Sequence, residues 1–577
     1  MSTRGRVGLL VAVAAGALTL AGTASAHAYL VKTVPAASVV LTASPPNVQL
    51  TFDEAVEPRF ATISVTDAAA HQQATGPPAR SPANPNTLVV PLKPHMPEGW
   101  YLVYWRAISV DGHPVQGAFT FAIGPNQGPA PQFVVPKISQ TATTTRLLIA
   151  RWVMFLSVMT AVGLFVLRVL IARPVVRRAP GSSLRAVSIA FVIASVVGLV
   201  SIPVYLDIST SVDSLRSAFA IGTLVPLFRV TAFGRAYVDL LIVFGLFCVA
   251  AWITLWLDRP EKEQRTIAEL GAIAGAFIAA GAVLLVPGTA GHAAQTAPRG
   301  LSLLLDWLHL VSGSIWMGGL IGLLVLWWGL GAANRVAGLR VAVPRFSNVA
   351  FVSVLVLLGS GIGATVIHMP TIASLWQTSY GQAILVKAAL LAVAMLGGAV
   401  NLLITKPRLD AARRDPARGK QAARLLRNTV RIETLLVVAA VFAAALLSSL
   451  APPAAALAKE GSALAHVGPG KVAATVHQNG YTLQVLVDPN KAVETNSFAL
   501  KLTKNGQPVR GADITLGFDM LDMQMPNQEY QLTETAPGVY SHPAPALVMV
   551  GHWGLSFNVT PKNGQPFTAF IVDHATG

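Results

Sequence analysis

Residues 147–171 have the sequence LLIARWVMFLSVMTAVGLFVLRVLI, an apolar stretch long enough to cross a bilayer as an α-helix. Across its 577 residues the chain is 53% hydrophobic and only 12% charged, with a mean hydropathy of +0.57. That balance excludes an ordinary soluble protein. Further apolar segments of similar length follow at 186–206, 236–257, 267–287, 303–330, 347–368, 383–405 and 430–451. The sequence therefore predicts a transmembrane domain of eight helices at 146–451, in contact with the lipid bilayer.

Basic residues predict the orientation of these helices, because cytoplasmic loops carry the excess of Lys and Arg. With the N-terminus outside, four groups of basic residues fall inside, whereas the outer loop 369–382 has no charged residue. The inner groups are Arg173, Arg177, Arg178 and Arg185; Arg259, Lys262 and Arg265; Arg335, Arg340 and Arg345; and the loop from Lys406 to Arg431. Membrane orientation thus explains the net charge of +16, and no nucleic-acid partner is expected.

The first 26 residues have the pattern of a signal peptide: two arginines, an apolar run and the small residues Ala24-Ser25-Ala26. Cleavage after Ala26 exposes His27, which then offers an α-amine and an imidazole to one metal ion. Nitrogen and oxygen donors favour Cu(II), and the segment 109–113 adds a carboxylate and an imidazole in Asp111 and His113. Because Cys248 is the single cysteine, any copper site must use His, Met and carboxylate ligands.

Two regions outside the membrane domain show the alternation of β-strands. Residues 27–124 contain runs such as 48–52 and 88–92 between Pro, Asn and Gly turns, which predicts an all-β sandwich or barrel, cupredoxin-like or immunoglobulin-like. A proline-rich linker is expected at 125–145. Residues 466–577 alternate again and contain three Asn-Gly turns, which predicts a second all-β sandwich on the same side of the membrane.

Three histidines, His292, His309 and His368, are expected at similar depth near the outer ends of the helices. Ionisable residues within membrane spans are costly and usually functional. Asp306 lies three residues before His309 and is a candidate to orient its imidazole, while Met317 and Met369 add thioethers for a membrane copper site. The alternative is that these histidines hydrogen-bond water or headgroups at the interface.

Other polar residues of the spans have simpler interpretations. Lys387 and Asn401 lie deeper or at other helix ends, while Arg345 and Glu433 lie near the inner surface and fit snorkelling or paired charges. The absence of a Walker motif, a Gly-rich phosphate loop or a phosphorylatable Asp motif argues against an ATP-driven pump.

Methionines are concentrated in the C-terminal region. A candidate Cu(I) site there comprises Met520, Met523, Met525, Met549 and His552. The alternative is that methionines alternating along a strand belong to the core.

These motifs resemble those of a CopC-like copper-binding domain fused to a CopD-like membrane domain. The CopC resemblance rests on His27-Ala28-Tyr29-Leu30, Pro35-Ala36, residues 50–56, residues 99–105 and residues 109–114; the CopD resemblance on residues 306–309, 316–320 and 345–347, Tyr380-Gly381, Lys387 and residues 431–433. The C-terminal region is similar to YtkA-like domains. The resemblance implies Cu(II) binding by His27, Asp111 and His113, and copper movement into or across a bacterial plasma membrane. The Met-rich Cu(I) motif of some CopC proteins is missing from the first domain.

The leading hypothesis is a copper-homeostasis protein, not an enzyme, that binds Cu(II) outside the membrane and imports copper. One alternative is copper buffering, tolerance or delivery to an oxidase, with other copper-handling proteins as partners. A second is a haem-binding or copper redox enzyme. Asp111 argues against an oxygenase, because an anionic ligand occupies a coordination position that oxygen needs.

Overall fold

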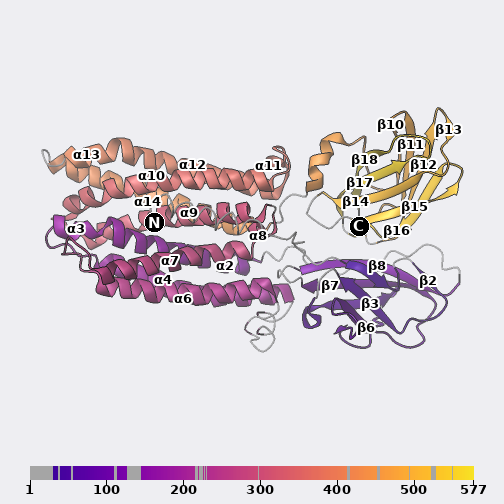
Figure 1. The fold of residues 1–577 in the computed structure, drawn as a ribbon, viewed down its shortest axis with the longest axis horizontal. Coiled ribbons are helices and arrows are strands. Elements are labelled where there is room, and N and C mark those ends of the chain that lie inside the picture. The colour runs from indigo at the N-terminus through magenta and orange to yellow at the C-terminus, as the bar shows by residue number, and fades with distance from the viewer. Residues whose placement is uncertain are drawn as a thin grey trace, which may run out of the picture. The chain divides into compact units, whose positions relative to one another are not determined.

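The computed structural model describes residues 30–36, 39–52, 56–108, 114–125, 144–214, 219, 225, 228, 231–296, 298–411, 416–450, 455–492, 494–521, 528–548 and 550–576. Contacts divide the chain into two compact units, one formed by the helices between residues 144 and 450 and the other by the β-strands (Figure 1). The expected signal peptide and nearly all of the expected linker lie outside the described residues.

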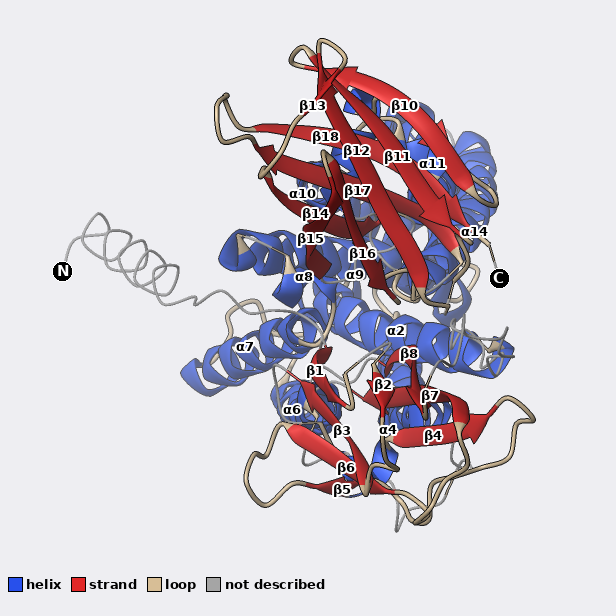
Figure 2. Ribbon diagram, turned by 90° about the vertical axis from the view of Figure 1, so that its right-hand side faces the viewer, coloured by secondary structure: helices blue, strands red, loops and turns tan. Residues whose placement is uncertain are grey.

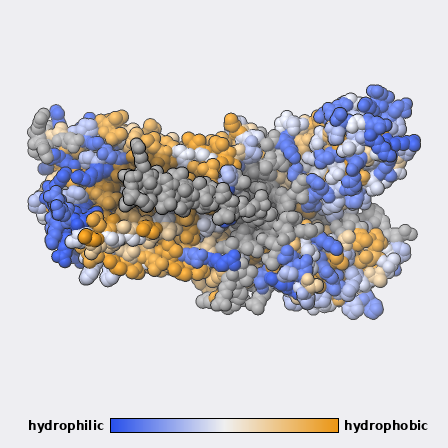
Figure 3. Space-filling model, viewed as in Figure 1, coloured by the Kyte–Doolittle hydropathy of each residue, from blue (hydrophilic) through white to orange (hydrophobic). Residues whose placement is uncertain are grey.

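Eight helices of the described chain are long and apolar enough to span a membrane, as predicted. The protein is therefore a multi-pass membrane protein, and apolar residues dominate the visible surface of the helical unit (Figure 3). The long helices are α2 (Thr145–Val166), α4 (Arg185–Ser214), α6 (Ala232–Leu257), α7 (Ile267–Thr289), α9 (Arg299–Gly329), α10 (Arg335–His368), α12 (Ser379–Val400) and α14 (Pro416–Leu447). Short elements between them are the π-helical turns η2 (Leu167–Ile171) and η3 (Asn401–Thr405) and the helices α3 (Arg173–Arg178), α8 (His292–Gln295), α11 (Ser374–Gln377) and α13 (Lys406–Asp410).

Consecutive long helices run in opposite directions, so the connections between them lie alternately at the two ends of the bundle (Figure 1). These two ends differ in their chemistry. The domain-linked end, where α2 begins and α14 ends, joins the β domains along the chain. The opposite end, the basic end, carries the arginine-rich connections. There Arg168 Nη1 and Arg173 Nε donate to the Asp258 carboxylate at 2.7 and 2.9 Å, and all three side chains are buried. Removing the negative partner would leave two buried cations without compensation.

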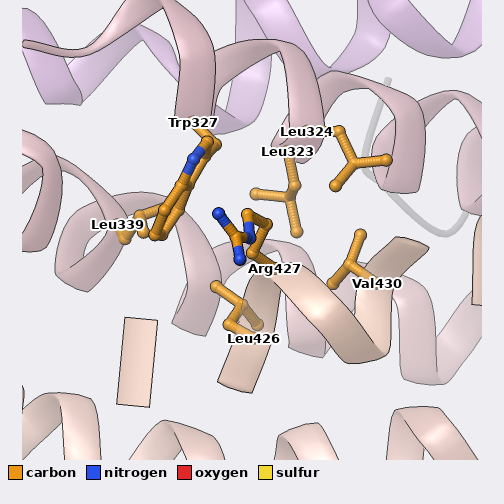
Figure 4. A pocket seen from close by; sticks show the side chains of 7 residues that line it. All are labelled: Leu323, Leu324, Trp327, Leu339, Leu426, Arg427 and Val430. Atoms are coloured by element: carbon orange, nitrogen blue, oxygen red, sulfur yellow. The ribbon is translucent and has the colours of Figure 1, made fainter. Parts of the chain in front are cut away.

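At the basic end, α9 and α14 pack through a tryptophan and arginines. The guanidinium of Arg427 lies 5.3 Å from the centre of the Trp327 ring (Figure 4). That of Arg335, at the start of α10, lies 4.6 Å from it. The cavity beside this ring encloses only about 10 Å³. A single water needs about that volume, so the cavity is a packing gap and not a ligand site.

Glycine contacts bring α2 and α9 unusually close together in the middle of the bundle. A Cβ atom at Gly163 would lie 2.1 Å from the Ser314 carbonyl oxygen and 2.6 Å from Gly318 Cα. Small residues at helix crossings are the usual means of close packing in membranes. This crossing anchors α9, which carries His309.

The N-terminal β domain consists of two four-stranded sheets, with strand orders β1-β3-β6-β5 and β2-β8-β7-β4 (Figure 2). Alternate residues of the strands point inward, and Leu50, Val65 and Phe121 are fully buried between the sheets. The elements are β1 (Leu30–Val34), β2 (Val40–Leu41), β3 (Asn47–Phe52), η1 (Pro58–Phe60), β4 (Thr62–Asp67), β5 (Ala79–Arg80), β6 (Thr87–Pro91), β7 (Gly99–Ile108) and β8 (Pro114–Ile123). The predicted sandwich is confirmed.

The C-terminal β domain is a ten-stranded sheet with the order β10-β11-β12-β16-β15-β14-β17-β18-β9, and β13 pairs with β12. It curls around one apolar core, as the alternating burial of its strands requires. Two of the predicted Asn-Gly turns have positive φ at both residues, at 479–480 and 505–506, which suits tight hairpins. The elements are η5 (Ala455–Ser462), β9 (His466–Val467), β10 (Val472–Gln478), β11 (Tyr481–Asp488), β12 (Asn496–Lys504), β13 (Gln507–Pro508), β14 (Asp513–Met520), β15 (Gln528–Ala536), β16 (Val539–Ala544), β17 (Gly551–Thr560) and β18 (Phe567–Ala575).

Candidate functional site

A polar cluster lies inside the bundle where α9, α10 and α12 meet. His309 of α9 is at its centre. The Nζ atom of Lys387, on α12, lies 3.0 Å from His309 Nε2. The other ring nitrogen, Nδ1, lies 3.1 Å from the Leu357 carbonyl oxygen and 3.2 Å from Ser360 Oγ, both on α10. Three helices distant in the sequence therefore hold one imidazole.

These contacts define the tautomer of His309. The Leu357 carbonyl can only accept a hydrogen bond, so Nδ1 carries the hydrogen. Ser360 Oγ donates to the Val356 carbonyl at 2.7 Å and so can accept from Nδ1 as well. Nε2 then keeps its lone pair and accepts from the Lys387 ammonium. The atom of His309 that a metal ion would use therefore faces Lys387.

Asp306 supplies the negative charge of the cluster. It lies one helical turn before His309, and its carboxylate packs against Gly288 of α7, where a Cβ atom would come within 2.6 Å of Oδ2. Its charge interacts with Lys387 and Tyr380 on α12. We expected Asp306 to orient the imidazole, but groups of α10 do so, and the charge of Asp306 acts on Lys387 instead.

The backbone leaves room for this cluster. A Cβ atom at Gly361 would lie only 3.1 Å from His309 Cε1, so a larger residue there would push against the ring. The N-terminus of α12 is capped by Thr378, whose Oγ1 accepts from the Gly381 amide at 3.0 Å. These local features position the His309 ring and begin the helix that carries Lys387.

His309 and His368 do not share one depth, and the prediction of a three-histidine cluster is wrong in that respect. His309 contacts α10 at residues 357–361, whereas His368 lies seven residues later, about 10 Å further along the helix. The ring of His368 instead lies 2.7 Å from the Ala364 carbonyl oxygen and 3.2 Å from Thr296 Oγ1. The sequence did not show this difference in depth, because the apolar segment was predicted to begin at residue 303. The helix α9 begins earlier, at Arg299, so His309 lies about 15 Å from its start.

Two of the remaining residues predicted for the membrane site, Met317 and Met369, lie apart from the cluster. Met317 is fully buried in the apolar core of the bundle, and Met369 follows the last residue of α10. His292 begins α8, but its side chain lies outside the described part of the structure. Among the described residues, no group of three or more His, Cys, Asp or Glu side chains is arranged to hold a metal ion.

A second buried polar group lies nearer the basic end. Glu433 of α14 is 2% exposed and accepts a hydrogen bond from Asn401 Nδ2, while Thr429 Oγ1 donates to Asn401 Oδ1 at 2.6 Å. Arg345, which we considered as a partner for Glu433, donates to the Val341 carbonyl at 3.0 Å instead. Glu433 is therefore a buried carboxyl group held by an amide and not a surface charge.

Sequence reasoning missed the pairing of Lys387 with His309. Burying the charge of a lysine within a membrane span is costly unless a polar partner is nearby. That cost could have indicated that Lys387 has such a partner. Helical spacing places Lys387 on α12 but does not show which neighbouring helix it faces. Ser360 gave no comparable signal, because serine is common at helix interfaces in membranes.

The predicted Cu(II) ligands His27, Asp111 and His113 lie outside the described residues and stay a prediction. The described strands β7 and β8 flank the segment 109–113 in the chain and pair in antiparallel register from Ile108↔Pro114 to Gly99↔Ile123. The first described residue after His27 is Leu30, at the start of β1.

The C-terminal candidate site is only partly described. Met520 is 3% exposed and packs in the core of that domain, which favours the core alternative, and the Cu(I) site stays a prediction. Alternation along β14 turns its side chain inward. His552 is exposed on β17, whereas Met523, Met525 and Met549 lie outside the described residues.

Three family models match successive parts of the chain: CopC domain over residues 30–124, Copper resistance protein D over residues 340–447, and YtkA-like over residues 475–557. The chain is a CopC–CopD fusion protein with a YtkA-like domain. The match to Copper resistance protein D contains Lys387, Ser360 and Glu433 of the fusion protein, whereas His309 precedes it.

Relatives of the CopC–CopD fusion protein support the same assignment. It is 27% identical to Copper transport protein CutJ of Bacillus subtilis (strain 168) over 553 residues, which cover 92% of each chain. It is 37% identical to Protein YobA of Escherichia coli (strain K12) over 98 residues, covering 17% of this chain and 79% of YobA. It is also 31% identical to Copper resistance protein C of Escherichia coli over 120 residues, covering 19% of this chain and 94% of the relative. The fusion protein thus belongs with copper transport and resistance proteins, and none of these relatives is named for a reaction.

Proposed function

We propose that this protein imports copper: the N-terminal β domain captures Cu(II) outside the cell and the bundle carries copper across the membrane through His309. One observation carries the proposal. The bundle holds a neutral imidazole whose Nε2 lone pair accepts from a buried ammonium, with the charge of Asp306 acting on that ammonium. A cation in the ammonium's place would meet a nitrogen ligand, and the negative charge of Asp306 would favour it there.

The capture step is assigned to His27, Asp111 and His113. The CopC match over residues 30–124 supports this assignment, as does the relative named for copper transport along nearly the whole chain. The arginine-rich connections at the basic end of the bundle support a cytoplasmic position for that end. Both β domains would then lie outside the cell, on the side where copper is captured.

Within the bundle, Lys387 holds the position that copper would take. Copper can bind His309 Nε2 only after the Lys387 ammonium has moved away from it, because both need the same lone pair. Asp306 provides a carboxylate toward which the displaced ammonium can turn.

Copper accumulation in bacterial cells that express the intact protein tests this proposal. His27→Ala and His309→Ala should each reduce accumulation severalfold relative to the unmodified protein at equal expression. His71→Ala is the matched control, because His71 is an exposed histidine of the same β domain that pairs with Asp67. Unchanged accumulation in both test variants would reject the proposal, and increased accumulation would indicate copper export.

A further inference from the structure

Two histidines lie side by side on the C-terminal β domain. His552 of β17 and His574 of β18 are directly opposite each other in the antiparallel register. Their ring centres are 4.6 Å apart, and the ring planes are tilted by 32°. Only His552 is among the copper ligands predicted from the sequence.

Both imidazoles lie on the face of the sheet that points away from the main core. Trp553 and Asp573, the next pair in the register, are fully buried on the core side. Because side chains alternate along a strand, His552 and His574 share the opposite face, where His552 is exposed and His574 half-buried. A metal ion can therefore reach the pair from solvent.

The sheet holds the backbone of this pair in place. The amide of Leu521, at the end of β14, donates to the carbonyl of His552 at 2.9 Å, so β17 is hydrogen-bonded on both sides at this residue. Beta carbons of directly opposed residues lie about 4.5–5.5 Å apart. Rotation of the two side chains is then sufficient to bring one nitrogen of each ring to a single ion.

A buried negative charge lies behind the pair. Asp573 is inaccessible to solvent, and its Oδ1 accepts from Asn490 Nδ2 at 2.9 Å, whereas its Oδ2 has no hydrogen-bond partner. Its charge interacts with His552 through the sheet. The field of an incompletely paired carboxylate favours a cation on the adjacent face.

We propose that His552 and His574 form a copper-binding site on the YtkA-like domain. Two imidazole nitrogens suit copper, and two ligands leave coordination positions open, so the ion can exchange with a donor or an acceptor. This site goes beyond the proposed function, because it requires neither His27 nor His309. It would give the C-terminal domain its own role in copper handling.

Copper content of the purified, signal-cleaved full-length protein tests the site. The protein is loaded with Cu(II), dialysed and measured by elemental analysis in a His27→Ala background, which separates this site from the capture site. His552→Ala and His574→Ala should each remove about one copper per chain, and the double variant should remove no more than either single variant. His477→Ala is the control, because His477 is an exposed histidine on β10 whose Nδ1 lies 3.1 Å from Thr482 Oγ1.

Three results would overturn the proposal. Unchanged copper content in either single variant would show that the pair does not bind the ion together. A loss of two ions in the double variant would mean two separate sites. Zinc that displaces copper at equal concentration would remove the copper assignment. Thermal unfolding of each variant verifies that the domain remains folded, and His574→Asn provides a second, less disruptive change.

Discussion

Replacing Gly163 by alanine should destabilise the bundle more than any ordinary substitution of one hydrogen by a methyl group. The new Cβ would lie 2.1 Å from the Ser314 carbonyl oxygen and 2.6 Å from Gly318 Cα. Both neighbours are backbone atoms, so no side-chain rotation relieves the contact. The two helices α2 and α9 must instead separate by about 1 Å to restore ordinary contact distances near 3.4 Å.

The magnitude follows from two opposing terms. A gap of about 1 Å forfeits up to half of the dispersion energy of the atoms that line it, and overpacking of this kind costs about 1–3 kcal/mol. Because backbone meets backbone here, we expect a loss of about 3 kcal/mol. Alanine in place of glycine inside a helix increases the stability of the helix by about 1 kcal/mol. A control variant without a steric clash should show this gain alone.

Gly245→Ala is the matched control, since Gly245 lies in α6 and a Cβ there would have no atom within 4 Å. Denaturation of the purified protein in mixed detergent micelles measures both variants. Gly163→Ala should unfold far more readily than the unmodified protein, and Gly245→Ala should be equal to it or slightly more stable. If both variants were equally stable, the close crossing of α2 and α9 would be refuted.

The remaining predictions concern buried charges. Lys387→Met should raise the affinity of the bundle for copper about tenfold, because His309 Nε2 loses its competing hydrogen bond; a competition titration with a chelator would show no change if Lys387 does not occupy that atom. Asp258→Asn should lower the free energy of unfolding in detergent by about 3–5 kcal/mol, because two buried arginines lose their carboxylate partner. Glu263→Gln removes the exposed partner of Arg177 and should cost under about 1 kcal/mol. Equal losses in the two variants would contradict this reasoning. Burial raises the pKa of Asp573 from 3.8 to about 6, so its ionised form disfavours the folded state and stability should fall as pH rises from about 4 to about 6. Asp573→Asn should recover up to about 3 kcal/mol above pH 7 in urea-dependent proteolysis of the C-terminal domain, and a gain independent of pH would count against this assignment.

Hydropathy and alternation predicted most of the architecture, because each depends on the nearest residues along the chain. A span such as 147–171 must be helical in lipid, since every backbone hydrogen bond has to be made inside the segment. Asn479-Gly480 likewise closes a hairpin through its own positive φ angles. The fold class, the eight spans and the segments of the chain that form the two β domains could therefore be predicted.

The candidate site was only partly predictable. His309 was selected because an ionisable group in a membrane span is costly, and that reasoning depends on residue type alone. Its assumed partners were wrong: His368 lies about 10 Å further along α10, and Leu357 and Ser360, not Asp306, hold the imidazole. In the C-terminal domain Met520 was assigned to metal, although strand alternation turns it into the core.

The sequence by itself determined which segments enter the membrane and which form strands, because solvent and backbone hydrogen bonding act locally. Only the tertiary structure decided that Lys387 meets His309, 78 residues away, and that His552 meets His574. Helical and strand periodicity assign a side chain to one face of its own element. The residue on the other side of the contact depends on how the elements pack, and packing is a property of the whole fold.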